Sequence, residues 1–177
     1  MTSDWISSTG CGSATISPKT TRSSSPSKRS TALAPRHANG LRAVLDPNVL
    51  VAALLSARGT PARVFRAWLD GVFELVVSPA LLAELERALG YPKLRRRIPA
   101  EEAEELIELL RRTATFVNDP PGDSAALTSS DPGDDYLLAL AMHTRSVLVS
   151  GDNDLLTIDT DLPIHPPAAF MAFLERD

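Results

Sequence analysis

The sequence of 177 residues contains a single cysteine, Cys11, and no run of about 18 apolar residues. One cysteine excludes an internal disulfide and any cysteine-based metal site. Without a long apolar run, we expect no membrane-spanning helix. A chain without disulfides suits the reducing cytoplasm, where we expect this protein to act. The length fits one ordinary domain with a sizeable core, and no internal repeat is visible.

Positive charge is scarce after the first 40 residues. Residues 1–40 contain five basic residues and one acidic residue, a net charge of +4. The remaining residues contain 13 basic and 21 acidic residues, a net charge of −8. An acidic domain repels phosphate groups unless metal ions bridge its carboxylates to them. The acidic residues of the second segment therefore need a chemical explanation.

The first 40 residues are rich in serine, threonine and proline and show almost no apolar periodicity. Such a segment buries too little surface to offset its ordering entropy, so we expect a disordered leader. A transit peptide is disfavoured because no amphipathic stripe is present. A start codon assigned too far upstream is a further alternative. We expect the folded domain to occupy residues 41–177.

From Leu41 onward, short apolar segments alternate with segments of helical spacing. The apolar segments predict strands at residues 41–45, 73–77, 115–117, 147–150 and 162–165. The helical spacing and its capping residues predict helices at residues 49–55, 61–70, 79–89, 101–112, 135–144 and 170–174. This alternation indicates a three-layer α/β/α fold with a central parallel sheet of four to five strands.

Four acidic residues are expected at the carboxyl ends of the predicted strands, where open α/β sheets bind ligands. Asp46 ends the first strand and Asp152 follows the fourth. Glu84 lies on the second turn of the helix after the second strand, and Asp135 begins the helix before the fourth. Each acid alone has a simpler explanation, as a helix cap, a turn residue or a solvated helix residue. Their convergence on one edge favours a shared role.

Clustered carboxylates cannot all stay ionised without a cation. Oxygen donors without nearby histidine or cysteine favour Mg²⁺ or Mn²⁺ over zinc. The spacing of an EF-hand calcium loop is incomplete, so calcium is disfavoured. Two divalent ions would clamp a phosphodiester and activate water. Asn48 is expected to position water or to hold Asp46, and Ser150 to add a hydroxyl to the same network.

Four segments, in this order, resemble the acidic motifs of PIN domains: residues 42–50 (RAVLDPNVL), 73–85 (FELVVSPALLAEL), 131–141 (DPGDDYLLALA) and 148–156 (LVSGDNDLL). The resemblance runs from about Leu41 to Leu174. It implies the PIN-like three-layer fold and a Mg²⁺- or Mn²⁺-dependent endoribonuclease. The sequence is most similar to VapC-like ribonucleases, the toxins of bacterial type II toxin–antitoxin modules. The resemblance therefore also implies an RNA substrate, a cognate antitoxin and a homodimer.

The resemblance assigns an acidic tetrad that binds metal and catalyses hydrolysis, with one outer metal ligand in addition. The tetrad is Asp46, Glu84, Asp135 and Asp152, and the outer ligand is Asp154. Asp134 competes with Asp135 for the third position, and the spacing to the alanines that follow favours Asp135. Pro47 and Ser150 stand where threonine is more common in the family.

A basic run follows the helix that carries Glu84. We consider it a possible RNA-binding surface, because basic side chains hold phosphates, although charge runs are more often solvated surfaces. The run consists of Lys93, Arg95, Arg96 and Arg97.

Two alternative functions remain. A non-catalytic PIN-like module could bind RNA within an RNA-processing complex, but the intact acids favour an enzyme. An aspartyl-phosphate enzyme or receiver could use Asp46 as its nucleophile or acceptor. This last function is disfavoured because Asn48 stands where such a site would place a second aspartate, and no well-placed lysine completes it.

Overall fold

A computed structural model describes residues 40–121 and 132–176 of the chain. The predicted leader and Asp131 lie outside the described residues, apart from Gly40. Among the described residues, five strands form one sheet in the order β3-β2-β1-β4-β5, and every neighbouring pair is parallel. The strands are β1 (Arg42–Leu45), β2 (Glu74–Val77), β3 (Thr115–Phe116), β4 (Val147–Val149) and β5 (Ile164–His165).

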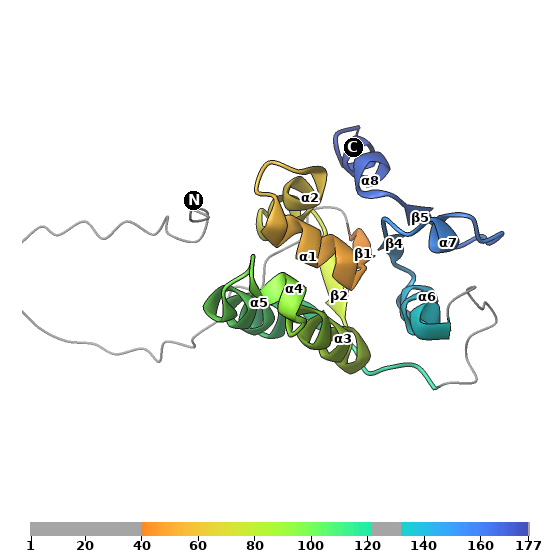
Figure 1. Cartoon of the computed structure of the whole chain (residues 1–177). Helices are drawn as coiled ribbons and strands as arrows, with labels where there is room; N and C mark the ends of the chain where they lie inside the picture. The colour runs from red at the N-terminus through yellow and green to blue at the C-terminus, as the bar shows by residue number, and fades with distance from the viewer. Residues whose placement is uncertain (1–39, 122–131, 177) are drawn as a thin grey trace, which may run out of the picture. The chain divides into compact units, whose positions relative to one another are not determined.

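Helices flank this sheet, as the alternating pattern predicts (Figure 1). They are α1 (Pro47–Leu55), α2 (Thr60–Leu69), α3 (Pro79–Leu89), α4 (Pro92–Arg95), α5 (Ala100–Thr113), α6 (Asp135–Thr144), α7 (Asn153–Leu156) and α8 (Pro167–Leu174). A short 3₁₀ turn, η2 (Pro132–Asp134), precedes α6. The four-residue helices α4 and α7 were not predicted, because one turn of helix is too short to show an apolar period.

Two helices begin directly where a strand ends, and the same local chemistry starts both. Asp46 caps α1 by accepting a hydrogen bond from the backbone N–H of Asn48, and Ser78 caps α3 by accepting one from that of Leu81. In each case proline follows the cap, where its fixed φ suits the first helical turn. Both helix starts therefore lie at the carboxyl edge of the sheet.

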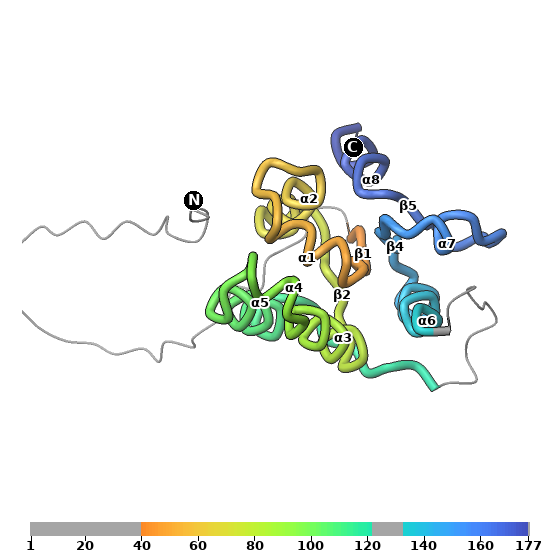
Figure 2. Tube along the Cα trace, in the orientation of Figure 1, coloured from red at the N-terminus to blue at the C-terminus, as the bar shows by residue number. Residues whose placement is uncertain are grey.

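The core is formed by the central strands and the faces of the helices that cover them. Ala43, Val44 and Leu45 of β1 are fully buried. At the carboxyl end of the chain, the ring of Phe170 packs edge-on against Phe73, with 5.2 Å between the ring centroids. Figure 2 shows α2 and α8 side by side although they are far apart in the sequence, and α8 also packs on β5.

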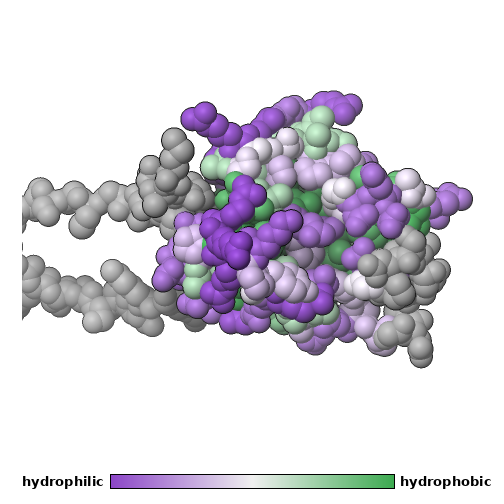
Figure 3. Space-filling view, in the orientation of Figure 1, coloured by the Kyte–Doolittle hydropathy of each residue, from purple (hydrophilic) through white to green (hydrophobic). Residues whose placement is uncertain are grey.

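The surface is mostly polar on the face drawn in Figure 3, where hydrophobic residues show as small areas between hydrophilic ones. None of the helices in the described residues has the length and apolar character needed to cross a membrane.

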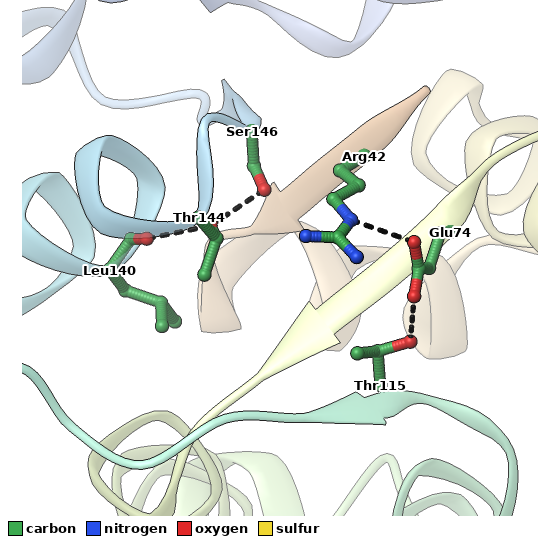
Figure 4. A network of polar contacts seen from close by, with 6 residues as sticks. All are labelled: Arg42, Glu74, Thr115, Leu140, Thr144 and Ser146. Carbon is green, nitrogen blue, oxygen red and sulfur yellow. Dashed lines mark hydrogen bonds and ion pairs between the residues drawn. The ribbon is translucent and has the colours of Figure 1, made fainter. Parts of the chain in front are cut away.

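Polar side chains at the amino edge of the sheet form hydrogen bonds with one another (Figure 4). Arg42 donates to Glu74 at 2.8 Å, and Thr115 donates to the same carboxylate, so the first residues of β1, β2 and β3 are joined. Just before β4 in the chain, the hydroxyl of Thr144 lies 2.7 Å from the hydroxyl of Ser146, and both residues are buried. This edge therefore contains charge that is already paired.

Candidate active site

The carboxyl edge of the sheet contains the point where the strand order reverses. The chain runs outward from β1 through β2 to β3 and then returns to β4 on the other side of β1. Ligands of open α/β sheets bind at such a switch point. Asp46 directly follows β1, and its backbone N–H donates to the carbonyl oxygen of Val149 at 3.0 Å. Asp46 therefore lies beside the end of β4.

Asp46 is a buried carboxylate with two fixed hydrogen bonds. Only 3% of its surface is exposed. The hydroxyl of Ser150 donates to Oδ2 of Asp46 at 2.5 Å, and the backbone N–H of Asn48 donates to Oδ1 at 2.7 Å. The helix-cap explanation of Asp46 is therefore correct but incomplete. Asn48 holds Asp46 through its backbone, as expected of a residue two positions further on.

Two other acidic residues, Asp152 and Glu84, are close enough to Asp46 to act on it electrostatically. Burial raises its pKa above 3.8, and the charges of Asp152 and Glu84 raise it further. The hydrogen bonds from Ser150 and Asn48 oppose this shift by stabilising the ionised form. Within the described residues, no lysine or arginine forms an ion pair with Asp46 or Asp152. A bound cation would therefore lower the electrostatic cost of keeping these carboxylates ionised.

Ser150 connects the two aspartates at the end of β4. It is fully buried, and its hydroxyl accepts a hydrogen bond from the backbone N–H of Asp152 at 3.0 Å while it donates to Asp46. Asp152 in turn caps α7, because its Oδ1 accepts from the backbone N–H of Asp154 at 2.9 Å. Asp154 is exposed on α7. The Ser150 hydroxyl thus links the carboxylate of Asp46 to the backbone of Asp152, and its supporting role in the site stays a prediction.

Glu84 approaches the cluster from α3, and Tyr136 approaches it from α6. Glu84 is half-buried and forms an ion pair with Arg87 at 3.3 Å. The pKa of Tyr136 is strongly raised, first by burial, then by the charge of Glu84 and its acceptor oxygen, and then by the charges of Asp46 and Asp134. Sequence reasoning missed Tyr136, because only the packing of α3 against α6 brings it beside Glu84.

The two candidates for the third acidic position are neighbours at the start of α6. Asp134 stands at the N-cap position and Asp135 is the first helical residue, and both are half-buried. The charge of Asp134 raises the pKa of Tyr136, as the charge of Glu84 does. Asp134 and Glu84 therefore act on the same hydroxyl. The preference for Asp135 over Asp134 stays a prediction.

The donor chemistry of the cluster fits a hard divalent cation, because all of its donors are oxygen atoms. In residues 40–121 and 132–176, however, no three acidic, histidine or cysteine side chains are close enough together to hold a metal ion. Mg²⁺ requires fewer protein ligands than this, since it usually keeps several waters and binds one or two carboxylates together with substrate phosphates. Asp46 and Asp152 are the candidates for such a pair, because the charge of Asp152 acts on the carboxylate of Asp46.

A pocket of about 330 Å³ opens beside this pair. Its lining includes Asn48 and Asp152, and the other lining residues are Val49, Ala52, Pro61, Gly151 and Pro167. The pocket gives solvent and ligands access to Asp152, the member of the cluster that lines it.

The basic run follows the C-terminal end of α3, the helix that carries Glu84. Lys93 and Arg95 belong to α4, which follows the end of α3, and Arg96 and Arg97 come directly after them. All four side chains are exposed. Because α3 has 11 residues and is about 16 Å long, the run is separated from the helix start at Ser78.

We expect Ser150→Ala to destabilise the fold by about 1.5–3 kcal/mol at pH 7, because it removes a buried hydrogen bond to a charged group. Ser150→Thr keeps the hydroxyl and is the matched control. Urea unfolding at pH 7 measures both variants. Equal stability of Ser150→Ala and the parent would show that the contact with Asp46 contributes nothing.

Residues 42–154 match the PIN domain family, and this match covers more than half of the chain. The protein belongs to the PIN domain family. A curated relative, the uncharacterized protein MJ1680 of Methanocaldococcus jannaschii, is 25% identical over 122 residues, which cover 67% of this chain and 75% of that protein.

Solved structures support the same fold. PAE2754 of Pyrobaculum aerophilum matches with a TM-score of 0.55 and 19% identity, covering 82% of this chain and 96% of that one. VapBC-1 of nontypeable Haemophilus influenzae matches with a TM-score of 0.51 and 19% identity, covering 72% and 99%. VapBC2 of Rickettsia felis, bound to a DNA fragment from its promoter, matches with a TM-score of 0.51 and 13% identity, covering 70% and 97%.

Proposed function

We propose that this PIN domain protein is a metal-dependent endoribonuclease. The observation that carries the proposal is the buried carboxylate of Asp46 at the switch point of the sheet, joined to Asp152 through Ser150 and approached by Glu84. A buried carboxylate without a cationic partner among the described residues costs folding free energy. Such a cost is typical of a functional site.

In this proposal, Asp46, Glu84, Asp135 and Asp152 hold Mg²⁺ or Mn²⁺, with Asp154 as an outer ligand and Asp134 as the alternative to Asp135. The bound ion would neutralise a phosphodiester and lower the pKa of a water. Ser150 and the backbone of Asn48 hold the Asp46 carboxylate in one orientation. The exposed run Lys93, Arg95, Arg96 and Arg97 is assigned to the RNA backbone beyond the cleavage site.

The biological role we propose is that of the toxin of a toxin–antitoxin module. The VapC-like sequence motifs and the fold shared with the two VapBC structures support this role. A cognate antitoxin, a homodimer and a cytoplasmic location belong to the same proposal. Co-purification with the product of an adjacent gene would test the antitoxin directly.

The catalytic proposal predicts cleavage of single-stranded RNA in the presence of Mg²⁺ or Mn²⁺ and none in EDTA. We expect Asp135→Asn to lower the rate at least about tenfold, because a metal ligand loses its charge, and Asp134→Asn to lower it less. The reverse order would assign the third position to Asp134. Labelled RNA on denaturing gels measures both variants. Cleavage that persists in EDTA would contradict the metal mechanism.

A non-catalytic RNA-binding module is the second candidate, favoured by the exposure of all four side chains of the basic run. It predicts RNA binding without cleavage in either metal. It also predicts that replacing Arg95, Arg96 and Arg97 with glutamine weakens binding, whereas Asp46→Asn does not.

A further inference from the structure

The hydroxyl of Tyr136 is a buried polar group beside the Glu84 carboxylate. Its oxygen is inaccessible to solvent, and no hydrogen bond of normal geometry reaches it from the described residues. A buried hydroxyl without a partner costs free energy, and such groups concentrate where a protein needs them for function. The acids around Tyr136 are those of the proposed active site, namely Glu84, Asp46 and Asp134.

Glu84 is the acid whose position is least fixed. Its only ion pair among the described residues is with Arg87, at 3.3 Å and one turn away on the same helix. The Arg87 side chain is 66% exposed and that of Glu84 is 31% exposed. An ion pair of this kind contributes little, because solvent screens it. Glu84 can therefore exchange Arg87 for another partner at small cost.

We infer that Tyr136 is a positioning residue for Glu84: its hydroxyl donates to the Glu84 carboxylate when this side chain leaves Arg87 and turns toward Asp46. The inference rests on the proposed function, since the purpose of the turn is to bring a further carboxylate to the metal. In the described residues, no three ligating side chains lie close together. The inference accounts for this, because Glu84 is paired with Arg87 in this structure instead of turning toward Asp46.

The chemistry of tyrosine suits this role. The phenol of a tyrosine keeps its proton at neutral pH, so the hydroxyl of Tyr136 can donate a hydrogen bond to a carboxylate. A lysine or arginine in this place would bring a positive charge that repels a divalent cation. A neutral donor fixes the carboxylate and leaves the negative charge of the cluster available.

The test is a calorimetric titration of the full-length protein with Mn²⁺ alone. We expect Tyr136→Phe to weaken Mn²⁺ binding about tenfold or more, the usual effect of losing a group that orients a metal ligand. Tyr91→Phe is the matched control, because Tyr91 is exposed and is the other tyrosine of the chain. It should bind Mn²⁺ as the parent does. Arg87→Gln frees Glu84 and should bind Mn²⁺ at least as tightly as the parent.

Thermal unfolding in EDTA separates positioning from structural support. Tyr136→Phe removes a hydroxyl without a partner, so its Tm should equal or exceed that of the parent. In RNA cleavage, kcat should fall while KM for RNA stays unchanged. A lower Tm with unchanged Mn²⁺ affinity would overturn the inference and leave the proposed function intact. A parent protein that binds no Mn²⁺ would overturn both.

Discussion

Asp46→Asn should reduce RNA cleavage at least about a hundredfold while the fold stays as stable as that of the parent at neutral pH. Asparagine caps a helix as well as aspartate does, and its side-chain oxygen can still accept from the backbone N–H of Asn48. What it loses is the charge that holds a cation. Steady-state cleavage of labelled RNA measures the activity, and Asp161→Asn, an exposed aspartate, is the control.

The stability of Asp46→Asn should depend on pH in a defined direction. The pKa of Asp46 is raised above 3.8 in the folded protein, so the folded state holds this proton more tightly than the unfolded state. The resulting stabilisation of the parent is complete below pH 3.8 and is lost as the pH rises through the folded pKa. The variant lacks this titration. Its stability relative to the parent should therefore increase with pH.

Urea unfolding at several pH values tests this direction. A variant that becomes less stable relative to the parent as the pH rises would contradict the conclusion that burial and neighbouring charges raise the pKa of Asp46. Such a result would indicate instead that its hydrogen bonds outweigh its burial.

Phe170→Ala should destabilise the fold by about 3–5 kcal/mol, the usual cost of removing a buried aromatic ring. Phe170 is fully buried, packs edge-on against Phe73 and anchors α8. Phe173 stacks on Phe170 from the same helix, with 6.5 Å between the centroids, but is 39% exposed. Phe173→Ala is therefore the matched control and should cost much less. Urea unfolding followed by circular dichroism measures both, and equal costs would mean that α8 is not anchored by Phe170.

The two edges of the sheet differ in a way that supports the functional proposal. At the amino edge, Arg42 balances Glu74 across two strands. At the carboxyl edge, Asp46 has hydrogen bonds but no ion pair with a basic side chain among the described residues. Folding alone would favour balanced charge at both edges. The imbalance at one edge is the feature that we assign to metal binding.

The sequence by itself determined the local elements and the residues at their ends. Apolar segments followed by Asp46-Pro47 and Ser78-Pro79 predicted strands that end in capped helices, and both junctions are present. Gly71 after α2 has a positive φ of 77°, a backbone conformation that glycine adopts without steric cost. These features are local: a cap, a proline and an apolar run act within a few residues, so their pattern is visible in sequence.

The tertiary structure alone decided the strand order and the contacts between distant segments. The hydrogen bond from Ser150 to Asp46 joins residues 104 positions apart, and it exists because β4 pairs with β1. Tyr136 lies near Glu84 only because α6 packs against α3, and the basic run follows the opposite end of α3 from the cap at Ser78. Residue types predict which groups can bind a metal. Packing determines which of them meet, because it depends on the whole fold rather than on any one segment.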